Sequence, residues 1–246
     1  MKLITRLFGP KPQPVLIYQP GQRVGSVDPV WPVIECPSGM AQKIIAQEAH
    51  NRDITPIILG SMRSLELIHE AQQASDPANA LRRSSLFDFD AWMRQAHEEW
   101  AEAPDMPPRG PVYSHAPHGD AIDMAVWNPL TSAPFKTVYI GLFPTADVTQ
   151  IPGLITGGGW NSYPEAGVHI ALHRRWRDRY GARLIGHGHD SMTFHVLRPP
   201  RDLAGSLDLA EEFYAYCPDL IDQGFGNLDT LAAALRNAPT WHFWWD

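Results

Sequence analysis

The alternation of apolar and polar positions predicts strands and helices in turn along the N-terminal half of the chain. Short apolar runs predict strands at Val15–Tyr18, Trp31–Glu35 and Ile54–Leu59. Apolar residues at helical spacing predict helices at Ser38–His50, Ser61–Ala74, Pro77–Arg83 and Phe89–Ala101. Ser38 is expected to cap the first helix. The order strand, helix, strand over so short a span predicts a right-handed parallel crossover between the second and third strands.

A proline-rich stretch interrupts the pattern after the last of these helices. Five prolines fall between Pro104 and Pro117. Such clusters are typical of linkers, because proline ends helices and lacks the N–H that a sheet needs. We therefore expect an N-terminal α/β region over residues 1–103, a linker over residues 104–134 and a C-terminal α+β domain over residues 135–246.

The pattern of the C-terminal part predicts a hairpin between helices. The expected strands are Lys136–Phe143, Arg183–His187 and Met192–Leu197, and the expected helices are Glu165–Tyr180, Ser206–Tyr216 and Asn227–Arg236. At the end of the chain, Trp241, Phe243 and Trp245 alternate with polar positions as on a short terminal strand, which leaves Trp244 or His242 at a surface. The whole pattern predicts an α+β fold with a mixed β-sheet and flanking helices, in one or two domains.

Cysteine content and hydropathy bear on the compartment. Cys36 and Cys217 are far apart and form no C-x-x-C pair, so neither a disulfide framework nor a zinc site is expected. No apolar run is long enough for a membrane span or a signal peptide. We expect a cytoplasmic protein that has no membrane contact.

The charge distribution bears on the partner. The formal net charge is −7 and the pI is about 5.8, which disfavours direct binding to nucleic acid. Residues 202–246 carry eight acidic residues against Arg236 alone. Such a charge attracts a basic protein partner, and we expect Asp208, Glu211 and Glu212 to be its main source.

Histidines are the main candidates for catalytic chemistry. On a strand, His187 and His189 would point to one side and Asp190 to the other, and imidazole and carboxylate are ordinary metal ligands. His169 and His173 lie four residues apart on a helix, but the sequence between them is not that of an H-E-x-x-H site. A metal site built from His169, His187, His189 and Asp190 is one alternative. The other is that the helix histidines pack in the core and the remaining cluster flanks a hairpin turn.

Other polar motifs have both a structural and a functional interpretation. Trp160 and Asn161 follow a run of glycines and are expected either to line a pocket or to plug the edge of the core. Cys217, at a helix end, is expected to pack rather than to act as a nucleophile. Asp219 and Asp222 form either an acid–base pair or helix caps.

A series of unusual short motifs runs through the C-terminal part in a fixed order. They are Gly158–Asn161, Val168-His169, Trp176, Arg179–Ala182, Asp190, Arg198–Pro200, Tyr216–Asp219, Asp222–Gly224 and Phe243–Asp246. In this order and spacing, the stretch of about residues 135–246 resembles a bacterial family known as domain of unknown function 4253. The resemblance implies a bacterial or phage protein and assigns no activity. Domains of this general kind occur among toxin-immunity genes.

The acidity, the nine tryptophans and the lack of a complete catalytic motif favour a non-catalytic, cytoplasmic protein-binding module without a cofactor. Its specific form would be an immunity protein that neutralises a basic bacterial toxin. The candidate binding residues are Trp160, Asn161, Asp190, Asp208, Glu211, Glu212, Asp219, Asp222 and Trp244. The alternatives are a metal-dependent hydrolase that uses His187, His189 and Asp190, and a scaffold protein of a larger assembly.

Overall fold

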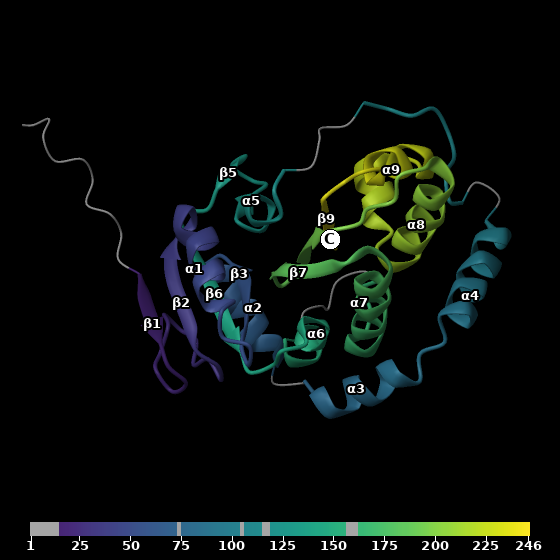
Figure 1. The fold of residues 1–246 in the computed structure, drawn as a ribbon. Coiled ribbons are helices and arrows are strands. Elements are labelled where there is room, and N and C mark those ends of the chain that lie inside the picture. Colours follow the sequence, from purple (N-terminus) through teal and green to yellow (C-terminus); the bar gives the residue numbers. More distant parts are fainter. Residues whose placement is uncertain (1–14, 73–74, 104–105, 115–118, 156–161) are drawn as a thin grey trace, which may run out of the picture.

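The computed structural model describes residues 15–72, 75–103, 106–114, 119–155 and 162–246 (Figure 1). Its strands are β1 (Leu16–Tyr18), β2 (Val33–Pro37), β3 (Thr55–Gly60), β4 (Trp127–Asn128), β5 (Ala133–Pro134), β6 (Thr137–Phe143), β7 (Ala182–His187), β8 (Ser191–Val196) and β9 (Thr240–Trp244). Its α-helices are α1 (Ala41–Glu48), α2 (Met62–Gln72), α3 (Pro77–Ser85), α4 (Phe89–Glu102), α5 (Ala121–Ala125), α6 (Ile151–Leu154), α7 (Ala166–Tyr180), α8 (Leu203–Tyr216) and α9 (Leu228–Leu235). Two 3₁₀ turns, η1 (Ser38–Met40) and η2 (Val148–Gln150), and a π-helix, η3 (Leu220–Phe225), complete the fold.

The main sheet confirms the predicted α+β class with a mixed sheet and flanking helices. Its seven strands have the order β1–β2–β6–β3–β7–β8–β9, and every neighbouring pair is antiparallel except β3 and β7. Strands β2 and β3 run parallel to each other, as the predicted crossover through α1 requires, because each is antiparallel to β6, which lies between them and pairs with both. Ile140 of β6 sits beside Ile34 on one side and Ile58 on the other.

Two apolar cores cover the two faces of the sheet, since successive side chains of a strand point to opposite faces. The smaller core contains Ile34, Ile58 and Ile140 and is covered by α1. The larger core joins strands of both halves to α7, α8 and α9, and its centre is aromatic. There Trp176 and Phe243 stack with their ring planes 3° apart and their centroids 5.5 Å apart.

The C-terminal elements follow the predicted pattern. The predicted helix forms α7 and ends at Gly181, whose φ of 62° is left-handed. The predicted hairpin forms β7 and β8, and β9 adds to it with Trp241, Phe243 and then Trp245 buried. Within the described ranges, no helix is long and apolar enough to cross a membrane.

Two predicted helix starts are wrong. Ser38 makes no capping hydrogen bond and lies in the 3₁₀ turn that precedes α1. Ser206 lies inside α8, where its hydroxyl donates to the Asp202 carbonyl at 2.7 Å. Asp202 itself caps α8 by accepting from the Gly205 N–H at 2.8 Å, so the helix begins earlier than predicted.

The segment between α2 and β6 wraps around the C-terminal part. Helix α3 packs against α7, α4 contacts α8, and α5 contacts β7 and β8. Between α4 and α5, residues 106–113 follow an extended path past α9 (Figure 1); these residues are called the strap below. Strands from both sides of the predicted linker share one sheet, and the division into two domains stays a prediction that proteolysis can test.

Candidate functional site

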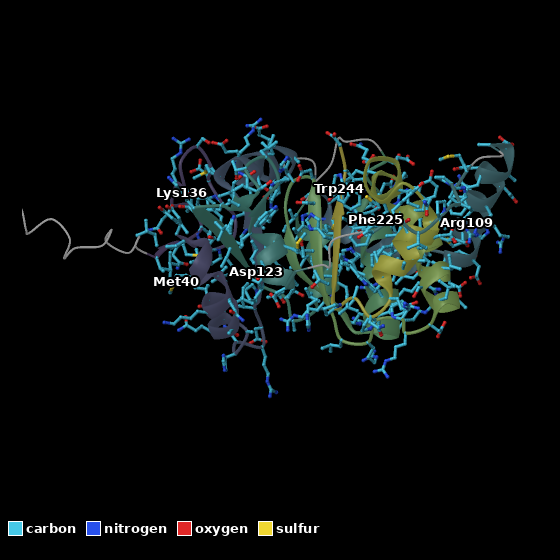
Figure 2. The ribbon with its side chains drawn as sticks, turned by 90° about the horizontal axis from the view of Figure 1, so that it is seen from above. Met40, Arg109, Asp123, Lys136, Phe225 and Trp244 are labelled. Atoms are coloured by element: carbon cyan, nitrogen blue, oxygen red, sulfur yellow. The ribbon has the colours of Figure 1, made fainter. Side chains whose placement is uncertain are left out.

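The terminal strand β9 carries Trp244 to the surface beside the π-helix η3 (Figure 2). Trp241 and Phe243 point into the core, whereas His242 and Trp244 remain half-buried, as the alternation predicts. A Cβ atom at Gly224 would lie 2.8 Å from the Cη2 atom of the Trp244 ring. Glycine at this position of η3 therefore leaves the room that the tryptophan ring occupies.

Two carboxylates of η3 and its preceding residue order this end of the molecule. Asp219 accepts from the backbone N–H of Asp246 and from Nε2 of Gln223, both at 3.0 Å. The predicted capping role of Asp219 is wrong, because its side chain accepts no capping bond from η3 and instead holds the last residue of the chain. Asp222 accepts from the Tyr214 hydroxyl at 3.4 Å.

Asp190 lies at the same end of the sheet, in the turn between β7 and β8. Its backbone carbonyl accepts from the Trp245 N–H at 2.9 Å, and its carboxylate lies 3.2 Å from Nε2 of His189. The residues that meet here are called the acidic end, and they are Asp190, Asp219, Asp222, Trp244 and Asp246.

The acidic end keeps much of its negative charge. Among the described residues, no Lys or Arg side chain forms an ion pair with Asp219 or Asp222. Burial raises the pKa of Asp222, the hydrogen bond from Tyr214 opposes the rise, and the charge of Asp219 adds to it. Like charges held together in this way cost stability, which makes the cluster a candidate for binding a cation or a basic side chain.

A second group of polar side chains lies inside the larger core. Nδ1 of His169 and Nε2 of His173 lie 2.5 and 3.2 Å from the Tyr216 hydroxyl, which is also 3.4 Å from Sδ of Met192. A phenol has one proton to donate, so at least one of the two imidazoles must donate its own N–H to the oxygen. The pair on α7 is thus a hydrogen-bonded part of the core, as one of the two predicted alternatives holds.

These buried groups are uncharged at neutral pH. Burial lowers the pKa of His187 to about 4. It lowers the pKa values of His169 and His173 as well, and the neighbouring His187 lowers both further. Burial also raises the pKa of the Tyr216 phenol. The cluster can therefore hold protons and hydrogen bonds in the core, but it offers no charged group to a substrate.

The geometry predicted for the His187, His189 and Asp190 cluster is wrong. The strand ends at His187, so the side chains that follow no longer alternate, and His189 and Asp190 contact each other. His187 is fully buried, and its Nδ1 donates to the Gly188 carbonyl at 2.8 Å. Within the described ranges, no group of three or more His, Cys, Asp or Glu side chains is placed to hold a metal ion.

Cys217 packs as predicted. It is fully buried, and its thiol donates to the Trp244 carbonyl at 2.9 Å. Burial raises the pKa of the thiol to about 12. Because the thiolate is the nucleophilic form, this cysteine is chemically inert near neutral pH.

Two of the acidic residues predicted on α8 lie at the surface, away from the acidic end. Asp208 is exposed. Glu211 is half-exposed, and its Oε2 lies 3.4 Å from Nε2 of His97 on α4. These two side chains add to the negative charge of the C-terminal part without joining the cluster around Trp244.

The predicted surface position of Glu212 is wrong, because its side chain is only 5% exposed. It accepts from Nη2 of Arg175 at 2.9 Å, from Nη1 of Arg179 at 2.8 Å and from Nε1 of Trp176 at 3.0 Å. Glu212 therefore ties α8 to α7 inside the molecule and contributes nothing to a binding surface.

The sequence pattern brought out some members of the acidic end and not others. Asp190, Asp219, Asp222 and Trp244 were predicted as binding residues, and Trp160 and Asn161 lie outside the described residues. Asp246 and Tyr214 were not singled out. The position of Asp246 directly after the alternating aromatic residues could have indicated that it lies beside Trp244. No sequence pattern links Tyr214 to Asp222.

Comparison with known proteins agrees with the motif order of the C-terminal part. Residues 139–246 match the family described as domain of unknown function (DUF4253). No curated protein and no solved structure matches the chain. The matched region includes most of β6, all of β7 to β9 and α7 to α9, and the whole acidic end.

Proposed function

We propose that this chain is a non-catalytic protein-binding module that binds a basic partner through the acidic end. The observation that carries the proposal is the position of Trp244, half-buried over Gly224 of η3, the helix that carries Asp222 and follows Asp219. An aromatic anchor near carboxylates that form no ion pair with a described Lys or Arg suits a Lys- or Arg-bearing surface, because the charges speed encounter and the ring slows dissociation.

The state of the catalytic candidates supports binding over hydrolysis. His187 and Cys217 are fully buried, and their pKa values keep the imidazole neutral and the thiol protonated. His189 is the more accessible histidine, but its partner is the adjacent Asp190 within one turn. Neither His187 nor Cys217 can therefore act as a base or a nucleophile toward a substrate at the surface.

The specific form that we propose is an immunity protein that neutralises a toxin encoded beside it. A cytoplasmic location fits this role, and the two cysteines, Cys36 and Cys217, are buried thiols that form no disulfide. The net charge of −7 suits an inhibitor of a basic enzyme.

The test is the kinetics of binding to the immobilised product of the neighbouring gene. Asp219→Asn combined with Asp222→Asn removes two charges and keeps one acceptor oxygen at each position, although the amide at position 219 can accept from only one of Gln223 and Asp246. We expect slower association with little change in dissociation. Trp244→Ala should instead speed dissociation, because it removes the anchor.

The matched control is Asp28→Asn combined with Asp53→Asn, which removes the same charge at exposed positions of the N-terminal half. Steering by the overall charge would slow the control and the acidic-end variant alike. Equal association rates for these two variants, or wild-type dissociation of Trp244→Ala, would place the interface elsewhere.

A further inference from the structure

The strap is held on the N-terminal end of α9 mainly through its backbone. The hydrogen bonds are Leu228 N–H to the Pro108 carbonyl at 2.9 Å, Asn227 Nδ2 to the Pro111 carbonyl at 3.1 Å and Tyr113 N–H to Thr230 Oγ1 at 3.1 Å. Bonds of this kind bind an extended peptide largely independently of its side chains, as in domains that recognise peptide segments.

One side chain of the strap adds specificity. Nε and Nη2 of Arg109 donate to the two carboxylate oxygens of Asp229 at 2.8 and 2.6 Å, and the next N–H, of Gly110, donates to the same carboxylate at 3.0 Å. Glu211 adds a further negative charge near the guanidinium. A planar, two-pronged contact of this type selects arginine over lysine.

The residues beside Arg109 narrow the recognised sequence. A Cβ atom at Gly110 would lie 3.3 Å from Nδ2 of Asn227, so a larger residue would press on the amide that holds the strap. At the start of the strap, Sδ of Met106 lies 3.6 Å from the Tyr214 hydroxyl. The contacts therefore recognise a short extended segment in which arginine is followed by glycine, and Pro108 and Pro111 contribute their backbone carbonyls.

We propose that the N-terminal end of α9, with Asn227, Asp229 and Thr230, is a peptide-binding site for extended Arg-Gly segments. The strap occupies this site within the chain, and a segment of the same chemistry from a partner protein competes for it. The site adjoins the acidic end, since the Tyr214 hydroxyl contacts both Met106 of the strap and Asp222. The proposal stands whether or not the chain neutralises a toxin.

The strap is suited to exchange with a competitor. Its arginine side chain is 56% exposed, and residues 111–113 are exposed as well. Polar contacts at a surface hold it rather than apolar side chains inserted into the core. Because it is tethered, it competes at an effective concentration on the order of millimolar, so a free peptide must overcome that advantage or meet a weakened strap.

The experiment measures binding of a fluorescein-labelled synthetic peptide with the sequence of residues 106–114 to the full chain by fluorescence polarisation. The Arg109→Ala chain should bind this peptide about tenfold more tightly than the wild type, since its own strap has lost the two-pronged contact. Adding Asp229→Asn to that chain should remove the gain. A control peptide with lysine in place of the arginine should bind the Arg109→Ala chain more weakly than the original peptide.

A second variant keeps the test decisive if Arg109→Ala leaves the strap docked. Arg109→Ala combined with Gly110→Val adds a steric conflict with Asn227 and should free the site further. Thermal melting by circular dichroism checks that each variant is folded. The proposal is overturned if both strap variants are folded and bind no peptide at up to about 1 mM. It is also overturned if adding Asp229→Asn to these variants leaves their peptide affinity unchanged.

Discussion

Substitutions at Glu212 test whether this acidic residue stabilises the interior of the fold or merely adds charge to its surface. Glu212→Ala removes the acceptor of Nε1 of Trp176, a fully buried residue, and also the partner of Arg175 and Arg179. An orphaned buried donor costs about 1–3 kcal/mol, and the removal of one partner from a buried ion pair costs about 3–5 kcal/mol.

The exposure of Arg175 and Arg179 determines how much stability is lost within the range of about 3–5 kcal/mol. Their side chains are 30% and 41% exposed, so both guanidinium groups regain water once the carboxylate is gone. We therefore expect the free energy of unfolding to fall by about 3 kcal/mol for Glu212→Ala. Glu212→Lys places a third cation beside them in a buried site and should lose more, out of a typical total of about 5–15 kcal/mol.

The assay is urea unfolding, followed by circular dichroism and tryptophan fluorescence. Asp208→Lys is the matched control, because it makes the same type of charge change on the same helix at an exposed position. It should change the free energy of unfolding by no more than about 0.5 kcal/mol. If Glu212→Lys and Asp208→Lys unfold at the same urea concentration, the internal tie between α7 and α8 does not exist.

Three further predictions concern acid stability, the C-terminus and the linker. The pKa of His187 is about 4 in the fold and about 6.5 in an unfolded chain. The neutral His187 therefore contributes fully to the free energy of unfolding above pH 7, and this contribution is lost as the pH falls from 6.5 toward 4. The loss is roughly 2 kcal/mol between pH 7.5 and 5. Urea unfolding at these two pH values should show this difference in the wild type and a smaller one in His187→Gln. Trp245→Ala should destabilise the fold by about 3–5 kcal/mol, and an unchanged melting temperature would mean that this ring is not core. Limited proteolysis should cut first between residues 103 and 117, whereas a resistant fragment that spans them would show that both halves form one unit.

Local patterns predicted much of the C-terminal part. The apolar stripe of α7, its end at Gly181 and the alternation of β9 all depend on spacing within one element, which the sequence carries directly. Among the site residues, Trp244 could be predicted on the same ground. A strand that points Trp241 and Phe243 into the core points His242 and Trp244 to the opposite side.

Contacts between distant segments could not be predicted in this way. The insertion of β6 between β2 and β3 depends on pairing across about a hundred residues. The continuous apolar run of β6 indicates a strand buried on both faces, but it does not identify the neighbouring strands. Glu212 looks like any acid on an amphipathic helix, because its partners Arg175 and Arg179 belong to another helix. The same holds for the strap, whose prolines resemble a free linker until Asp229 is placed beside Arg109.

The measurement that tests the proposed function most directly is co-expression with the neighbouring gene. We expect a stable one-to-one complex, measured by size-exclusion chromatography with light scattering, and restored growth of cells that express the toxin. Both effects should weaken when Trp244→Ala is combined with Asp219→Asn and Asp222→Asn, and persist in the Asp28→Asn and Asp53→Asn control. A folded wild-type chain that forms no complex and restores no growth would contradict the binding role.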